Sequence, residues 1–143
     1  MSDTSATNDH TAINATMTFG LLAPGTPAVP IDARLRYDTE DPYAMGVRFH
    51  TGQGVVEWMF ARELLADGLI AAAGEGDIRV RPSTEDPELV LVELVTPGGH
   101  AVLTASAEDL ADFLDRSYDL VPPGDEHLWV DFDEELARLA STN

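Results

Sequence analysis

Two tight turns inside residues 31–60 constrain the fold more than any other feature of this chain. Apolar and polar residues alternate on both sides of each turn, which is the pattern of strands with one buried face. The first turn lies near Asp41, and Gly52 and Gln53 lie in the second. Because a slip of one residue would expose every apolar side chain, both hairpins must bury the same face. The stretch therefore predicts three antiparallel strands.

The alternation also predicts a register for each hairpin. In the first hairpin we expect Tyr37 opposite Tyr43, and in the second we expect His50 opposite Val55. The inward pairs that follow are Leu35–Met45, Ala33–Val47 and Ile31–Phe49 in the first hairpin, and Phe49–Val56, Val47–Trp58 and Met45–Phe60 in the second.

Charged residues occupy the opposite face of the same three strands. The predicted register places Arg48 between two carboxylates, with Asp32 across from it on one side and Glu57 on the other. Cross-strand pairs of opposite charge contribute about 0.2–1 kcal/mol each, so we interpret this trio as structural. Arg34 and Arg36 share the face, which makes the patch mixed in charge rather than basic.

The remaining elements follow from periodicity and turn residues. A helix over residues 61–67 follows the third hairpin strand, and Gly68 stands where a left-handed cap residue belongs. Ser106 is the expected N-cap of a second helix, which has an apolar stripe. The register places Trp58 in the core, whereas Trp129 suits either core or surface. The further expected elements are strands over residues 13–23, 77–81, 88–96 and 100–104 and a terminal helix over residues 131–140.

This order of elements predicts an α+β protein with a barrel-like antiparallel sheet of about seven strands flanked by helices. Residues 1–12 are polar and predict a disordered N-terminal tail, and residues 13–143 predict a single domain. The two edges of such a sheet must be closed, covered or paired in an oligomer.

The charge balance restricts the possible partners. The chain carries 26 acidic and eight basic residues, for a net charge of −18, and all eight basic residues are arginine. A surface this acidic repels a phosphate backbone, so we expect no nucleic-acid partner. No apolar run is long enough to span a membrane, and no signal pattern opens the chain, so we expect a cytoplasmic protein without membrane insertion.

No catalytic, metal or cofactor pattern rises above chance in this sequence. The absence of cysteine excludes thiolate chemistry and disulfides. The acidic cluster at residues 131–135 lacks the spacing of a calcium loop and is better explained as helix capping. His50, His100 and His127 show no metal-ligand spacing, and no nucleophile elbow supports a catalytic triad. We therefore expect no enzyme and no cofactor.

Several motifs give the chain a resemblance to a known family. The segments LRYD, DPYA, FHTG, EW-x-FAR-x-LLA-x-GL and GDIRV are similar to those of the SsgA-like proteins of actinobacteria. The residues that carry the resemblance are Arg36, Tyr37, Asp38, Asp41, Pro42, Tyr43, Phe49, His50, Gly52, Glu57, Trp58, Phe60, Arg62, Leu64, Leu65 and Gly68. These positions are more easily explained as fold determinants than as a reactive site.

The resemblance implies a function that composition alone does not. SsgA-like proteins are non-enzymatic regulators of cell division and sporulation-specific septation, and the SsgB type is an adaptor that recruits FtsZ or promotes its assembly. The family fold is whirly-like and assembles as a homotrimer. The implied partners are FtsZ or another SsgA-like protein, and the implied location is the division septum. The subfamily stays open between SsgB-like, SsgA-like and another paralogue.

The whirly-like fold also implies an alternative function. Whirly-type proteins bind single-stranded nucleic acid, so this chain could serve as such a binding module. The net charge of −18 and the lack of lysine argue against it.

Overall fold

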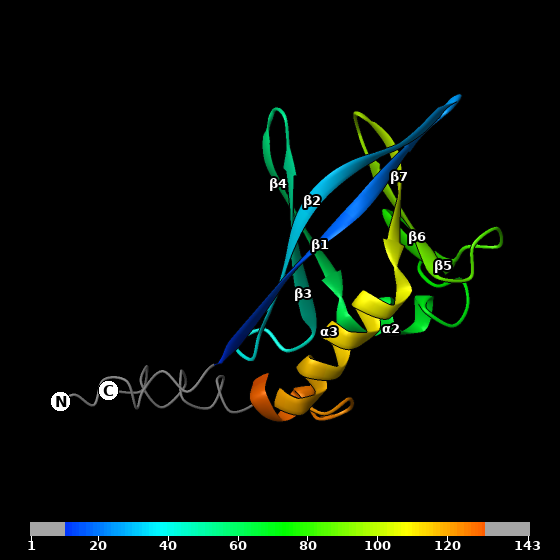
Figure 1. The fold of residues 1–143 in the computed structure, drawn as a ribbon. Helices are drawn as coiled ribbons and strands as arrows, with labels where there is room; N and C mark the ends of the chain where they lie inside the picture. The colour runs from blue at the N-terminus through cyan, green and yellow to red at the C-terminus, as the bar shows by residue number, and fades with distance from the viewer. Residues whose placement is uncertain (1–10, 131–143) are drawn as a thin grey trace.

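The computed structural model describes residues 11–130 of the 143-residue chain. Seven strands form one antiparallel sheet in the order β4-β3-β2-β1-β7-β6-β5 (Figure 1). The strands are β1 (Ala12–Ala23), β2 (Thr26–Asp38), β3 (Ala44–Thr51), β4 (Gly54–Ala61), β5 (Ile78–Pro82), β6 (Leu89–Thr96) and β7 (Gly99–Ser106). The helices are α2 (Arg62–Gly68) and α3 (Ala107–Leu120).

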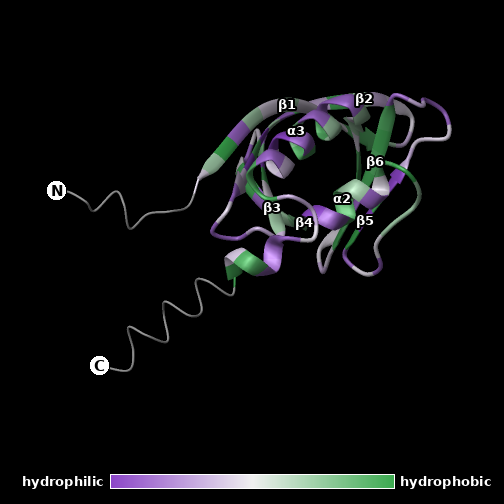
Figure 2. Ribbon diagram, turned by 90° about the horizontal axis from the view of Figure 1, so that it is seen from below, coloured by the Kyte–Doolittle hydropathy of each residue, from purple (hydrophilic) through white to green (hydrophobic). Residues whose placement is uncertain are grey.

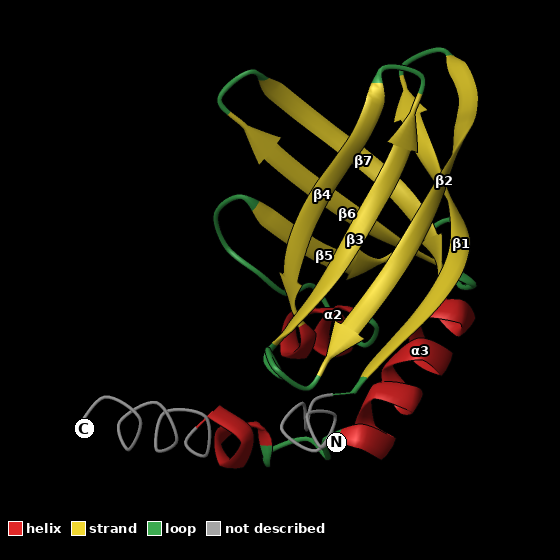
Figure 3. Cartoon of the chain, turned by 90° about the vertical axis from the view of Figure 1, so that its left-hand side faces the viewer, coloured by secondary structure: helices red, strands yellow, loops and turns green. Residues whose placement is uncertain are grey.

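The sheet curls into a half-barrel, with β2, β3 and β4 on one side and β5, β6 and β7 on the other (Figure 3). The two sides are joined by a short pairing of β1 with β7, in which Gly20 lies opposite Thr104 and Leu21 opposite Leu103. A Cβ atom on Gly20 would lie 2.6 Å from the Thr104 hydroxyl oxygen, so glycine allows this close approach. The predicted α+β, barrel-like antiparallel fold is confirmed.

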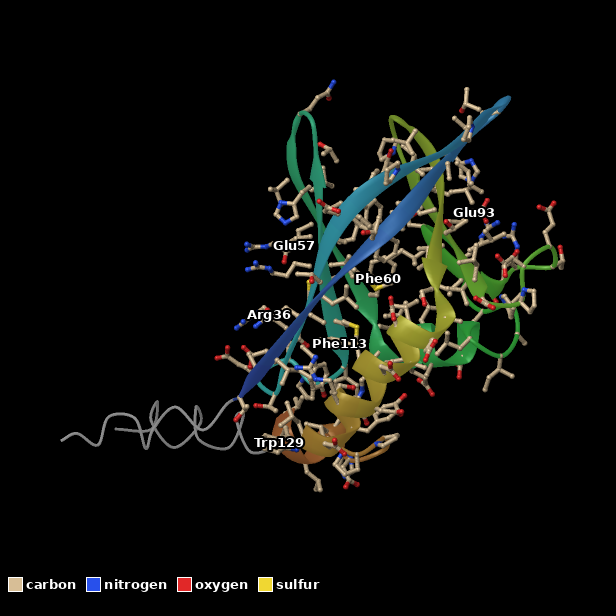
Figure 4. All side chains as sticks on the ribbon, in the orientation of Figure 1. Arg36, Glu57, Phe60, Glu93, Phe113 and Trp129 are labelled. Carbon is tan, nitrogen blue, oxygen red and sulfur yellow. The ribbon has the colours of Figure 1, made fainter. Side chains whose placement is uncertain are left out.

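Both helices lie across the opening at one end of the curled sheet (Figure 2). Helix α3 begins at the predicted cap, where the Ser106 hydroxyl accepts a hydrogen bond of 3.1 Å from the Asp109 backbone N–H. Its apolar stripe is Leu110, Phe113 and Leu114, and all three side chains are buried. Phe113 of α3 and Phe60 of β4 point into the interior between the helix and the sheet (Figure 4).

The second hairpin has the predicted register throughout. His50 pairs with Val55, Val47 with Trp58 and Met45 with Phe60. The inward row of β4 is not buried along its whole length, because Val56 is 47% exposed whereas Phe60 is 1% exposed. The N-terminal half of β4, which includes Val55 and Val56, therefore lies outside the core.

The predicted register of the first hairpin is wrong by two residues. Leu35 pairs with Val47 and Ala33 with Phe49, whereas Tyr43 lies in the turn instead of opposite Tyr37. The turn is longer than expected because the backbone carbonyl of Asp38 accepts from the N–H of Asp41 at 2.9 Å. A shift of two keeps every side chain on its predicted face, which is why the core alone did not determine the register.

The predicted left-handed conformation of Gly68 is also wrong. Gly68 is the last residue of α2, and Leu69 caps the helix in a right-handed conformation. A glycine is needed here for another reason: a Cβ atom would collide with the side chain of Val80 on β5. Helix α2 thus packs closely on β5.

Parts of both predicted ends lie outside the described residues. Strand β1 begins at Ala12, one residue before its predicted start, and residues 1–10 of the predicted tail are not described. The predicted terminal helix over residues 131–140 also falls outside them. Residues 126–130 are helical, and Trp129 packs partly buried against the core. Within residues 11–130, no helix is both long and apolar enough to cross a membrane.

Candidate interaction surface

The buried guanidinium of Arg62 ties the start of α2 to the end of α3. Arg62 is 1% exposed, and its Nη1 donates to the carbonyl oxygen of Val121 at 2.8 Å and to the carbonyl and hydroxyl oxygens of Ser117 at 3.3 Å each. Its Nη2 donates to a carboxylate oxygen of Glu126 at 2.5 Å. One side chain therefore binds two carbonyl oxygens at the C-terminal end of α3.

Two tyrosine rings enclose the same guanidinium. Its central carbon lies 5.0 Å from the ring centre of Tyr37 and 4.9 Å from that of Tyr118, within the range of cation–π attraction. Burial raises the pKa of Tyr37 to about 12, although the Arg62 charge acts in the opposite direction. The Tyr37 hydroxyl donates to the carbonyl oxygen of Pro42 at 2.8 Å. Burial likewise raises the pKa of Tyr118.

Glu126 remains the charged partner in this arrangement. Burial alone would raise the pKa of its carboxyl group. The hydrogen bonds from Arg62 and from the backbone N–H groups of Glu126 and Gly124 outweigh burial and lower that pKa. A cleft of about 360 Å³ borders the ion pair between α2 and the segment that follows α3. Arg62 lines this cleft, but its guanidinium is already engaged in the hydrogen bonds to Val121 and Glu126 that stabilise the fold.

The outer face of β2 and β3 carries a different arrangement of arginines from the predicted one. Glu57 lies opposite Arg48, and the two side chains are 3.5 Å apart, as expected. The predicted pairing of Arg48 with Asp32 is wrong: Asp32 pairs with His50, and Arg48 faces Arg34. The two-residue shift of the first hairpin causes this change. The charge trio is therefore replaced by two facing arginines with one carboxylate beside them.

A shallow hollow of about 440 Å³ lies over these arginines. Its lining residues are Asn14, Arg34, Arg36, Gly46, Arg48 and Glu57. Arg36 and Glu57 project outward from the sheet, on the side away from Phe60 (Figure 4). The side chains of Arg36 and Arg48 are 52% and 61% exposed. The hollow thus presents charged groups to solvent.

The edge strand β4 is the second exposed feature. The opposite edge of the sheet is partly covered, because Ala73 forms a two-bond bridge with Val80 of β5. Strand β4 has a paired neighbour only in β3 within residues 11–130. It exposes Val55, Val56 and Met59, which are 56%, 47% and 50% accessible. An open edge with apolar side chains favours pairing with another chain.

The structure divides the residues of the family motifs into two groups. Those that build the interior are Tyr37, Pro42, Phe49, Phe60, Arg62, Leu65 and Gly68, all buried, with Trp58 and Leu64 partly buried against them. Those at the surface are Arg36, Asp41, Tyr43, His50, Gly52 and Glu57, with Asp38 half-buried. Of these motif residues, only the second group is available to a partner.

Sequence reasoning missed the polar network around Arg62. Its partners Ser117, Val121 and Glu126 follow it by 55 to 64 positions. No local pattern links residues so far apart. The one local indication of a buried charge was that Arg62 stands among apolar residues at the start of the helix segment. Within residues 11–130, no group of three or more histidine, aspartate or glutamate side chains is placed to hold a metal ion.

Comparison with known proteins identifies the family. The family model described as "Streptomyces sporulation and cell division protein, SsgA" matches residues 31–126. The chain belongs to the SsgA family. A relative from Saccharopolyspora erythraea, named sporulation-specific cell division protein SsgB, is 61% identical over 133 residues, which cover 92% of this chain and 94% of that protein. The SsgB of Streptomyces coelicolor is 43% identical and covers 91% of this chain and 96% of its own.

Solved structures of the SsgA family share the fold. One comes from work in which mutations in SsgB correlate to longitudinal cell division during sporulation of Streptomyces coelicolor. It aligns with a TM-score of 0.80 at 43% identity and covers 84% of this chain and 96% of that chain. An SsgA-like sporulation-specific cell division protein of Thermobifida fusca aligns with a TM-score of 0.82 at 43% identity. The alignment covers 90% of this chain and 95% of that chain. The predicted family is confirmed. The names of these relatives describe cell division rather than a reaction.

Proposed function

We propose that this protein is a non-enzymatic adaptor of sporulation septation that recruits FtsZ or promotes its assembly, in the manner expected of an SsgB-like protein. The observation that carries the proposal is its 61% identity, over 92% of the chain, to a sporulation-specific cell division protein SsgB. Its site of action is the cytoplasmic side of the division septum. The sequence offers no catalytic motif in support of an enzyme, and the relatives are named for cell division.

The proposal includes assembly with further copies of the same chain as a homotrimer. The open edge of β4 supports it, because Val55, Val56 and Met59 would leave water when a second chain packs there. The other partners are FtsZ and another SsgA-like protein. Single-stranded nucleic-acid binding remains the alternative, and the net charge of −18 opposes it.

Deletion of the gene from the organism that carries it tests this function. We expect the strain to form fewer sporulation septa, and a fluorescent FtsZ fusion to lose its rings at those positions. Reintroduction of the intact gene should restore both. Normal septa and normal FtsZ rings in the deletion strain would overturn the proposal.

A further inference from the structure

Two arginines face each other on the outer surface of the sheet. Arg34 of β2 is the direct cross-strand partner of Arg48 of β3. Cross-strand partners have Cβ atoms about 4.5–5.5 Å apart, and like charges in this position destabilise a sheet. Arg36 lies two residues farther along β2 on the same face. Folding alone therefore gives no reason to place Arg34 here.

The surrounding carboxylates compensate this group only in part. Glu57 approaches Arg48 at 3.5 Å, and Asp38 binds Arg36 at 2.9 Å. The side chain of Arg34 has no ion-pair or hydrogen-bond partner within residues 11–130. Gly46, opposite Arg36, also lines the hollow and lies beside the side chains of Met59 and Glu57. The guanidinium groups thus surround a hollow that has room for another charged group.

The concentration of positive charge contrasts with the rest of the molecule. Three of the eight arginines of a chain with net charge −18 stand on this one face. On the other side of the half-barrel, Glu93 is paired with Arg81 at 3.6 Å and His100 at 2.6 Å, and it faces Arg79. On the outer face of β2 and β3, Arg36 and Arg48 each have a carboxylate partner, and Arg34 adds a third positive charge beside them.

We propose that the outer face of β2 and β3 binds an acidic peptide segment of a partner protein through Arg34, Arg48 and Arg36. One carboxylate would lie between Arg34 and Arg48 and relieve their repulsion. A second would reach Arg36, because two residues of extended peptide span about 7 Å, the same step that separates Arg34 from Arg36 along β2. Arginine forms paired hydrogen bonds with carboxylates, which makes the fit specific as well as electrostatic.

A peptide suits this face better than a nucleic acid does. A nucleic acid carries a phosphate at every nucleotide, and it would extend past three arginines onto the acidic remainder of the surface. Glu57 lines the hollow, Asp38 is paired with Arg36, and Asp32 lines the neighbouring hollow along β2. A short segment with two or three carboxylates confines its charge to the arginines, and repulsion from more distant acids is screened beyond about 10 Å at 0.1 M salt.

Fluorescence anisotropy with a labelled synthetic peptide tests this site on the full-length protein. The peptide alternates aspartate and alanine, and a matched peptide has asparagine in place of aspartate. We expect the aspartate peptide to bind, the asparagine peptide not to bind, and the affinity to fall as salt is raised. No binding of the aspartate peptide would overturn the proposal. This experiment contains no FtsZ, so its outcome is independent of the proposed function.

Three variants that each remove one positive charge locate the site. We expect Arg34→Gln and Arg48→Gln to weaken peptide binding at least about tenfold, whereas the control Arg79→Gln on β5 changes it less than about twofold. Arg34→Gln should also unfold at the same or a higher urea concentration than the wild type, because it removes the facing charges. An equal loss in all three variants would overturn the proposal, since it would reflect net charge alone.

Two other occupants of the face are distinguished by the same variants. If a labelled single-stranded DNA bound more tightly than the peptide and depended on Arg34 and Arg48, the face would be a nucleic-acid site. If Arg34→Gln changed the oligomeric state in light scattering, the face would be a contact between copies of this chain. Either result would overturn the proposal.

Discussion

Arg62 and Glu126 are 64 positions apart in the chain and form a 2.5 Å ion pair beneath the end of α3. The side chain of Arg62 is 1% exposed and that of Glu126 14%. The pair joins the helix that follows the first four strands to the segment that follows the last helix. It therefore connects the middle of the chain to the end of the described residues.

Replacing Arg62 should destabilise the protein strongly. Arg62→Met removes the guanidinium that donates to the Glu126 carboxylate and the Val121 carbonyl, and breaking a buried pair in this way costs about 3–5 kcal/mol. Urea unfolding followed by circular dichroism measures the loss. Arg116→Met is the control, because Arg116 lies over the Phe113 ring at the surface and should cost less than about 1 kcal/mol. Equal losses in the two variants would contradict the buried network.

Acid should remove the contribution of Glu126. The folded state lowers the pKa of this carboxyl group below its ordinary value of 4.5. Its stabilisation is therefore present above that ordinary value and is lost as the pH falls through the lowered pKa of the folded state. We expect the difference in unfolding free energy between the wild type and Glu126→Gln to be large at neutral pH and to shrink in acid. A difference independent of pH would show that the ionised carboxylate has no such role.

Alkali should act through Tyr37. Its pKa in the folded state is about 12, above the ordinary value of 10.0, so the unfolded chain loses this proton first. The stabilisation is fully present below pH 10.0 and is lost as the pH rises toward about 12. The pKa of Tyr118 is raised as well, so ultraviolet absorbance of tyrosinate should show two late ionisations in the wild type and one fewer in Tyr37→Phe. An unchanged number of late ionisations in the variant would contradict the assignment to Tyr37.

The contact between α2 and β5 should tolerate no side chain at Gly68. Gly68→Ala places a methyl group against Val80, and overpacking of this kind costs about 1–3 kcal/mol. Gly98→Ala is the matched control, because a Cβ atom there meets open space and the residue has no positive φ. Thermal unfolding of both variants tests the prediction. A control that loses as much as Gly68→Ala would count against this explanation.

The open edge of β4 should hold the copies of the chain together. Met59→Lys introduces a charge on that edge, which disfavours pairing with another strand, and we expect the homotrimer to dissociate. Ile70→Lys is the control, because Ile70 is 84% exposed in the segment after α2. Light scattering at several concentrations gives the mass of each variant. A trimer that survives Met59→Lys would place the contact elsewhere.

The two hairpins show where sequence periodicity is sufficient and where it fails. The second turn has only Gly52 and Gln53 between its strands, so the register could be predicted pair by pair. The first turn spans residues 39–43 and is closed by its own hydrogen bonds. It shifts the strand register by two residues, which leaves every side chain on its predicted face. The periodicity predicts the face correctly and leaves the register undetermined.

That small error had a large effect on the predicted site. It paired Arg48 with Asp32 and hid the cross-strand pairing of Arg48 with Arg34. The resulting patch looked neutralised and structural. Arg62 was beyond sequence reasoning for another reason, because its partners are distant in the chain and come together only when α3 packs onto the sheet. The identity of Gly68 was informative, but its cause is packing against Val80 rather than a turn.

Sedimentation of purified FtsZ with GTP tests the central claim most directly. We predict that adding this protein increases the fraction of FtsZ in the pellet, and that the protein itself appears there only when FtsZ is present. Bovine serum albumin at the same concentration is the control for unspecific crowding. If the pelleted fraction of FtsZ stays unchanged and this protein remains in the supernatant at every ratio, the proposed role in FtsZ recruitment and assembly is contradicted.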